Sequence, residues 1–144
     1  MSSTKAEKFK EKWITSFMKN LEERLDEKRR TELMIASGRD CARREAIGMA
    51  KSCKGDVDAL VKKLARILGK NNCRRQKDQV HLTYTKCFCK LVNNGPTRLP
   101  DTYCICSQGW VMEMFETAAQ KPVKVRILQT IKRGAPSCKF VANL

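Results

Sequence analysis

Hydrophobic residues recur at every fourth position near the start of the chain, which is typical of an amphipathic helix. The pattern predicts one long helix over residues 4–30, with Glu and Lys on its other faces. We interpret the apolar stripe as a packing surface, either within the core or between two copies of the chain. The stripe consists of Phe9, Trp13, Phe17, Leu21 and Leu25.

Three further helices are predicted before residue 70. Gly38 is expected to end the first of them, because glycine commonly closes helices. Asp40 and Asp56 are expected to cap the other two, since an aspartate side chain accepts hydrogen bonds from the first free backbone N–H groups. These helices cover residues 31–36, 41–53 and 57–68.

Strand-like alternation replaces helical spacing after Arg75. Val80, Leu82 and Tyr84 alternate with polar residues, which predicts a half-buried strand. Residues 102–106 are expected to be extended. Ser107 then caps a helix that Pro122 prevents from continuing. Two more strands are predicted over residues 123–129 and 138–141.

The order of these elements indicates an α+β fold, with N-terminal helices packed on a small antiparallel sheet that contains one inserted helix. The length of 144 residues suits a single domain. Within it, we expect residues 1–37 to form a helical N-terminal extension and residues 38–144 to form a cysteine-containing core.

The chain is strongly basic, with a formal net charge of +15. Such a charge favours nucleic acids, anionic membranes or acidic ligands as partners. The basic residues are dispersed, however, so a solvated basic surface is the preferred interpretation and nucleic-acid binding the alternative. No stretch approaches the ~20 apolar residues of a transmembrane helix. The N-terminus lacks a signal sequence, and we expect a cytoplasmic protein.

Eight cysteines include two Cys-x-Cys pairs, Cys87 with Cys89 and Cys104 with Cys106. In an extended chain, residues two apart face the same side. Each pair would therefore direct two thiols the same way, and four thiolates are a suitable ligand set for zinc or for an iron–sulfur cluster. The alternative, equally weighted, is that several of these cysteines are small buried hydrophobic residues.

Cys41 is the candidate catalytic residue. It follows the predicted N-cap Asp40, where the helix dipole and nearby arginines would favour the thiolate form. That would suit a cysteine-dependent hydrolase or reductase, while simple packing remains open. The single histidine, His81, is expected on the surface. No hydrolase elbow, phosphate-binding loop, dinucleotide fingerprint or zinc-protease helix is present, so catalysis stays undecided.

The C-terminal half contains five motifs in a recognisable order: Cys104-Ile-Cys-Ser-Gln-Gly-Trp110, Met114-Phe115-Glu116, Pro122-Val-Lys-Val125, Thr130-Ile-Lys-Arg-Gly134 and Cys138-Lys-Phe140. Together they resemble the 4-vinyl reductase type domain, also called the predicted hydrocarbon-binding domain. The stretch from Gly38 to Cys89 is similar to a cysteine-rich subfamily of uncharacterised prokaryotic proteins with the same ending. The first 37 residues contain no recognisable family motif.

The resemblance implies a fold like that of haem–nitric-oxide sensor domains and vesicle-tethering subunits, with helices and a sheet enclosing an apolar pocket. It also implies small-molecule binding and cysteine-held metal. Thr130 stands where many relatives carry a cysteine, and the position of His81 argues against haem ligation.

The sequence therefore predicts a small-molecule-binding or sensor module for an apolar or thiol-reactive ligand. A homodimer through the Phe9–Leu25 helix is the expected assembly. The candidate ligand-binding residues are Arg39, Cys41, Trp110, Met114, Phe115, Arg133 and Cys138. The candidate ligands for zinc or an iron–sulfur cluster are Cys87, Cys89, Cys104 and Cys106.

Overall fold

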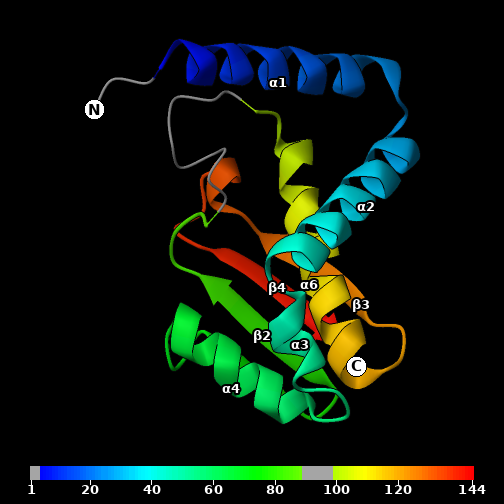
Figure 1. Cartoon of the computed structure of the whole chain (residues 1–144), viewed down its shortest axis with the longest axis vertical. Coiled ribbons are helices and arrows are strands. Elements are labelled where there is room, and N and C mark those ends of the chain that lie inside the picture. Colours follow the sequence, from blue (N-terminus) through cyan, green and yellow to red (C-terminus); the bar gives the residue numbers. More distant parts are fainter. Residues whose placement is uncertain (1–3, 89–98) are drawn as a thin grey trace.

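Helices cover one face of a four-stranded antiparallel sheet in the computed structural model, which describes residues 4–88 and 99–144 (Figure 1). This arrangement confirms the predicted α+β class. The helices are α1 (Lys5–Arg24), α2 (Glu27–Glu45), α3 (Ile47–Lys51), α4 (Val57–Leu68) and α6 (Ile105–Ala119), with 3-10 turns η1 (Asp101–Cys104) and η2 (Ile131–Arg133). The strands are β1 (Cys73–Gln76), β2 (Gln79–Tyr84), β3 (Lys124–Gln129) and β4 (Cys138–Asn143).

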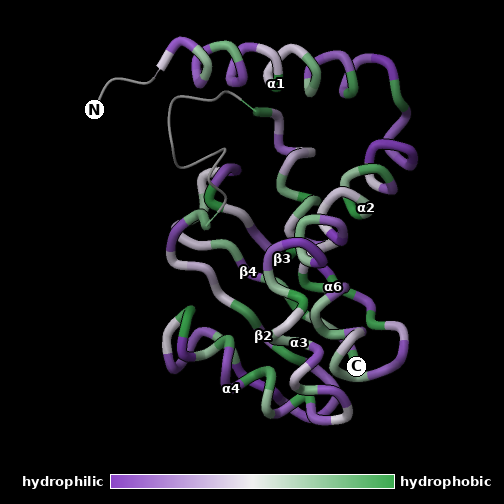
Figure 2. The backbone as a smooth tube through the Cα atoms, viewed as in Figure 1, coloured by the Kyte–Doolittle hydropathy of each residue, from purple (hydrophilic) through white to green (hydrophobic). Residues whose placement is uncertain are grey.

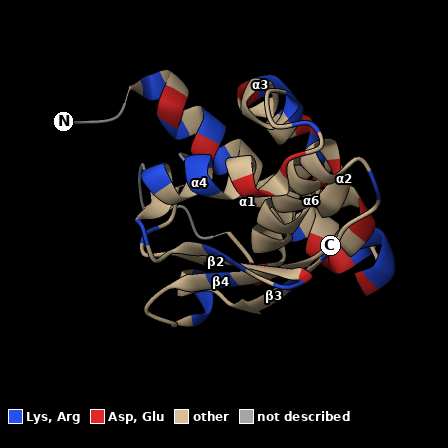
Figure 3. Ribbon diagram, turned by 90° about the horizontal axis from the view of Figure 1, so that it is seen from below, with Lys and Arg blue, Asp and Glu red and all other residues tan. Residues whose placement is uncertain are grey.

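The sheet has the strand order β1-β2-β4-β3, so the last strand of the chain lies between β2 and β3. Val80 lies opposite Ala142, and Leu82 opposite Phe140, and these four residues face the helices. Figure 3 shows the helices on that side of the sheet, while the described residues place no helix over the other side. β1 was not predicted, because only Cys73 among its four residues is buried and no alternation marks it.

The main core lies between the sheet and α6. Phe115 of α6 and Phe140 of β4 are its largest fully buried side chains. Figure 2 shows hydrophobic residues along much of α6, whereas α1 and α4 alternate between hydrophobic and hydrophilic residues along their length. None of the helices in the described ranges is both long and apolar enough to cross a membrane.

The N-terminal segment forms two helices rather than the single helix predicted over residues 4–30. The first begins as expected, because Thr4 and Glu7 cap it reciprocally. It ends at Arg24, and Asp26 then starts α2 by accepting a hydrogen bond from the Arg29 N–H at 2.8 Å. The N-cap at Asp26 therefore starts a new helix, although the apolar spacing that predicted one continuous helix extends to Leu25.

α2 continues without a break through Gly38 and Asp40 to Glu45, so the predicted helix boundary there is wrong. Gly38 is buried inside the helix because α6 crosses against it. A Cβ atom at Gly38 would lie only 1.8 Å from the carbonyl oxygen of Cys106, and one at Gly109 would lie 2.1 Å from that of Ile35. The two glycines thus allow the two helix backbones to touch.

Residues 102–106 are helical, not extended as predicted, because η1 leads directly into α6. Tyr103 of η1 is buried in a second, smaller core with Met18 of α1 and Met34 of α2. This small core holds α1 across one end of the molecule in Figure 1, away from the sheet.

Candidate functional site

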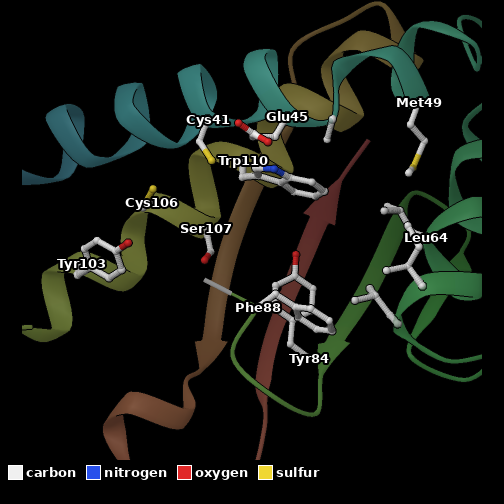
Figure 4. Close-up of a pocket in the computed structure, with 13 residues that line it drawn as sticks. Cys41, Glu45, Met49, Leu64, Tyr84, Phe88, Tyr103, Cys106, Ser107 and Trp110 are labelled. Atoms are coloured by element: carbon white, nitrogen blue, oxygen red, sulfur yellow. The ribbon is translucent and has the colours of Figure 1, made fainter. Parts of the chain in front are cut away.

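A pocket of about 420 Å³ lies between α2, α4, β2 and α6 (Figure 4). Apolar and aromatic side chains make up most of its wall. Its lining residues are Cys41, Glu45, Ala46, Met49, Leu64, Ile67, Leu68, Tyr84, Phe88, Tyr103, Cys106, Ser107 and Trp110.

Each of the three long helices around the pocket contributes two lining residues four positions apart. Side chains at this spacing lie on the same face of a helix, so each pair points the same way. Local helical geometry therefore builds three of the pocket walls. The pairs are Cys41 and Glu45 on α2, Leu64 and Leu68 on α4, and Cys106 and Trp110 on α6.

Aromatic rings form the side of the pocket next to the sheet. Tyr84 meets Phe88 edge to face with 5.4 Å between ring centroids, and it packs against Phe140 at 5.0 Å. Figure 4 shows the Tyr84 hydroxyl pointing toward Trp110. Burial raises the pKa of Tyr84, and the nearby thiols of the sheet raise it further. The hydroxyl is therefore neutral at physiological pH and can donate or accept a hydrogen bond.

Two thiols face each other across the α2–α6 contact. In Figure 4 the sulfur atoms of Cys41 and Cys106 point toward one another at the pocket wall. Cys41 lies near the C-terminal end of α2, so the prediction that it starts a helix is wrong. The favourable dipole at a helix N-terminus does not act on its thiol.

The Cys104–Cys106 pair does not point in one direction. Because both residues lie in helical turns, positions two apart project to different sides of the chain. Cys106 lines the pocket. Cys104 instead lies close enough to Cys87 and Cys138 to interact with them electrostatically. Burial, reinforced by these two thiols, raises the pKa of Cys104 to about 11.

Within residues 4–88 and 99–144, no group of three or more His, Cys, Asp or Glu side chains is placed to hold a metal ion. Cys89, the fourth predicted ligand, lies outside the described residues. The zinc or iron–sulfur site thus stays a prediction.

Comparison with known proteins places the chain in a family. The family of unknown function (DUF6144) matches residues 1–142. The chain belongs to this family. No curated protein matches it. The DUF6144 match agrees with the predicted uncharacterised family, and the resemblance to the 4-vinyl reductase type domain stays a prediction.

The fold of this DUF6144 member is similar to a solved structure, the crystal structure of the phenol-responsive sensory domain of the transcription activator PoxR with phenol. The TM-score is 0.57 at 16% sequence identity, and the match covers 92% of this chain and 73% of that chain. At this identity the likeness is one of fold.

Among the predicted ligand-binding residues of this DUF6144 member, Cys41 and Trp110 line the pocket. Met114 and Phe115 lie in the main core instead, with no exposed surface. Trp110 packs against the edge of this core and shares the pocket wall with residues of α2 and α4, whereas Met114 and Phe115 lie inside the core.

The other predicted residues lie apart from the pocket. Arg39 donates hydrogen bonds to Glu113 at 2.8 Å and Glu116 at 2.6 Å. Arg133 pairs with Asp101 at 3.5 Å near the surface. The Cys138 sulfur is buried and accepts a hydrogen bond from a backbone N–H of η2.

Several pocket residues were not singled out from the sequence. Leu64 and Leu68 were recognised only as part of an apolar helix face, and Tyr84 only as part of a strand. Glu45 carried no signal, because a surface glutamate near a helix end has no distinguishing pattern. The sequence did offer one indication of these residues. Glu45 lies four positions after Cys41, and Trp110 four positions after Cys106, so each pair shares a helix face.

Proposed function

We propose that this DUF6144 member is a small-molecule-binding sensory domain whose ligand occupies the pocket beside Trp110. The observation that carries the proposal is a pocket of about 420 Å³ walled by aromatic and aliphatic side chains. Small-molecule sites are typically concave, mostly apolar and roughly 300–1,000 Å³ in volume. The fold likeness to a phenol-responsive sensory domain supports the same function.

The pocket is suited to a ligand of about the size of one aromatic ring with a short substituent. Such a ligand and the pocket wall would together bury on the order of 400 Å² of apolar surface, worth ~10 kcal/mol. Lost translational and rotational freedom offsets at least ~4 kcal/mol of this. We therefore expect dissociation constants of roughly tens of micromolar for simple aromatic compounds.

Tryptophan fluorescence tests the proposal directly. The chain has two tryptophans, and replacing the exposed one, Trp13→Phe, leaves Trp110 in the pocket wall as the only reporter. Titration with small substituted benzenes should shift or quench its emission with saturation. Ala46→Phe, which fills the pocket, should abolish the response while the melting temperature confirms folding. A Trp110 signal that responds to no compound in the panel would refute ligand binding here.

Cysteine-dependent chemistry is the second candidate, and one observation favours it. Cys41 and Cys106 present their sulfur atoms at the wall of the same pocket (Figure 4). A thiol-reactive ligand bound there would meet a nucleophile without further movement. Protection of Cys41 from iodoacetamide by a bound aromatic compound would support this extension.

We also propose a homodimer through the exposed aromatic residues of α1. A metal bound by Cys87, Cys89, Cys104 and Cys106, and a cytoplasmic location, are proposed on sequence grounds only. Nucleic-acid binding is the second alternative to small-molecule binding. Arg74 and Arg126, on the outer face of the sheet, are the residues that we would expect to contact the nucleic acid.

A further inference from the structure

The pocket has an unusual charge for this chain. Lys and Arg number 30 against 15 Asp and Glu, yet among residues 4–88 and 99–144 no Lys or Arg lines the pocket. Glu45 is the only charged residue that lines it within these ranges. The described wall thus carries one carboxylate, while the Lys86 ammonium lies 5.4 Å from the centroid of the Phe88 ring.

We propose that this pocket binds a small organic cation, an ammonium group attached to an aromatic or apolar body. The inference rests on the proposed small-molecule function and names its ligand class. Ammonium groups are attracted to the faces of aromatic rings, and aromatic cages recognise them in proteins. Here Trp110 and Tyr84 supply the rings, because the Phe88 ring already pairs with the Lys86 ammonium, and Glu45 supplies the opposite charge.

The positions of these groups suit such a ligand. In Figure 4 the Glu45 carboxylate lies beside the Trp110 ring, and the Tyr84 hydroxyl points toward that ring from the opposite wall. A cation placed between the Glu45 carboxylate and the Trp110 ring would contact a carboxylate and an aromatic ring together. The aliphatic side chains of Met49 and Leu64 then line the space for its apolar body.

The local electrostatics also favour a cation. Glu45 is the last residue of α2, where the helix dipole places negative partial charge. The neighbouring Arg43 is engaged by Glu113 at 2.8 Å, and Glu45 takes part in no ion pair recorded for the described residues. Its carboxylate is thus not neutralised within that part of the chain. An anionic ligand would meet repulsion from both the carboxylate and the helix end.

A pair of ligands with the same shape separates charge from size. Phenyltrimethylammonium and tert-butylbenzene differ mainly in the quaternary nitrogen, so binding of both to the Trp13→Phe protein measures the contribution of charge. We expect the ammonium compound to bind about tenfold more tightly. Benzylamine should likewise bind more tightly than benzoate, which should bind most weakly.

Glu45→Gln tests the role of the carboxylate, and Glu32→Gln is its matched control on an exposed position of the same helix. Glu45→Gln should weaken binding of phenyltrimethylammonium several-fold and leave tert-butylbenzene within twofold. Glu32→Gln should change neither.

The outcomes separate this inference from the proposed function. Equal affinity for the ammonium compound and its neutral isostere would overturn the cation preference and leave the pocket's binding function intact. An equal loss of both ligands in Glu45→Gln would also overturn it, because the residue would then act through structure alone. Absence of binding by every probe would overturn the function and the inference together.

Discussion

Glu113 shows how single side chains hold the pocket walls in place. Its two carboxylate oxygens accept hydrogen bonds at 2.8 Å from Arg39 and from Arg43, so one residue of α6 fixes two residues of α2. Burial alone would raise the pKa of Glu113. The hydrogen bonds from the two arginines outweigh burial and hold that pKa below its ordinary value of 4.5.

The lowered pKa makes this contribution dependent on pH. A carboxyl group whose pKa is lower in the folded state stabilises the fold above its unfolded pKa, and the effect disappears as the pH falls through the folded value. Glu113→Gln should therefore reduce the free energy of unfolding by ~1–3 kcal/mol at neutral pH. The difference from wild type should shrink steadily below pH 4.5, the ordinary value.

Urea denaturation at several pH values measures this effect. Glu23→Gln is the control, because Glu23 forms an exposed pair with Lys19 at 3.9 Å and should contribute less than ~0.5 kcal/mol. A loss in Glu113→Gln that stays constant down to pH 3 would mean that packing, and not charge, accounts for it.

At the scale of elements, the crossing of α2 and α6 brings the pocket thiols and rings together. The helix backbones touch at Gly38 and Gly109, and the residues one turn away, Cys41 and Cys106, then reach the same wall. A side chain at either glycine would separate the helices, because a backbone carbonyl cannot turn aside as a flexible side chain can.

Gly38→Ala tests this contact, and Gly48→Ala is a matched control. A methyl group at Gly38 would meet the Cys106 carbonyl, so we expect a loss of ~2–3 kcal/mol in unfolding free energy. At Gly48, in α3, nothing lies within 4 Å of the added carbon. That change should be neutral or stabilising by up to ~1 kcal/mol, since alanine is the better helix former. Equal effects in the two variants would contradict the close crossing.

The same crossing explains what sequence patterns predicted and what they missed. The α4 helix and the inward-facing residues of β2, β3 and β4 follow from local periodicity, which the fold preserved. Gly38 and Asp40 carry strong helix-boundary signals, yet contact with α6 kept α2 continuous through both. Local sequence signals cannot distinguish a glycine that ends a helix from one that is needed because a second helix packs against that position.

The candidate site was predictable to a similar extent. Cys41 and Trp110 were predicted to bind a ligand, and both line the pocket. Glu45 and Tyr84 were not singled out, because their place in the pocket wall depends on which elements meet in space. The expectation that Cys104 and Cys106 share a direction failed because it assumed an extended chain where α6 begins.

At the scale of the whole molecule, α1 is only partly covered by the rest of the described chain. Its inner residues Met18 and Leu21 are buried, whereas Phe9, Trp13 and Phe17 are 69%, 57% and 44% exposed. Trp13 and Phe17 stack in parallel with 5.3 Å between centroids, which makes a flat apolar surface. Exposed aromatic residues in a continuous patch usually mark an interaction site. Figure 3 shows Lys, Arg, Asp and Glu residues along much of the rest of α1.

The spacing of the three rings favours a second copy of the chain as the partner. Phe9 and Phe17 lie four residues on either side of Trp13, so an antiparallel helix pair related by a two-fold axis would set Trp13 against Trp13 and Phe9 against Phe17. Two-fold interfaces require this kind of self-complementary surface. Six half-exposed rings would bury on the order of 600 Å², less than a standard stable interface, so the dimer should be weak.

Light scattering over a range of concentrations tests the dimer. The wild-type mass should rise from 16.5 kDa toward twice that value as the concentration increases. Trp13→Ala should keep the protein monomeric, because it removes the ring at the centre of the contact. Leu128→Ala, which alters an apolar side chain 52% exposed on the sheet instead, should behave as wild type. A wild-type mass that stays at 16.5 kDa up to about millimolar concentration, where even weak association shows, would rule out self-pairing through α1.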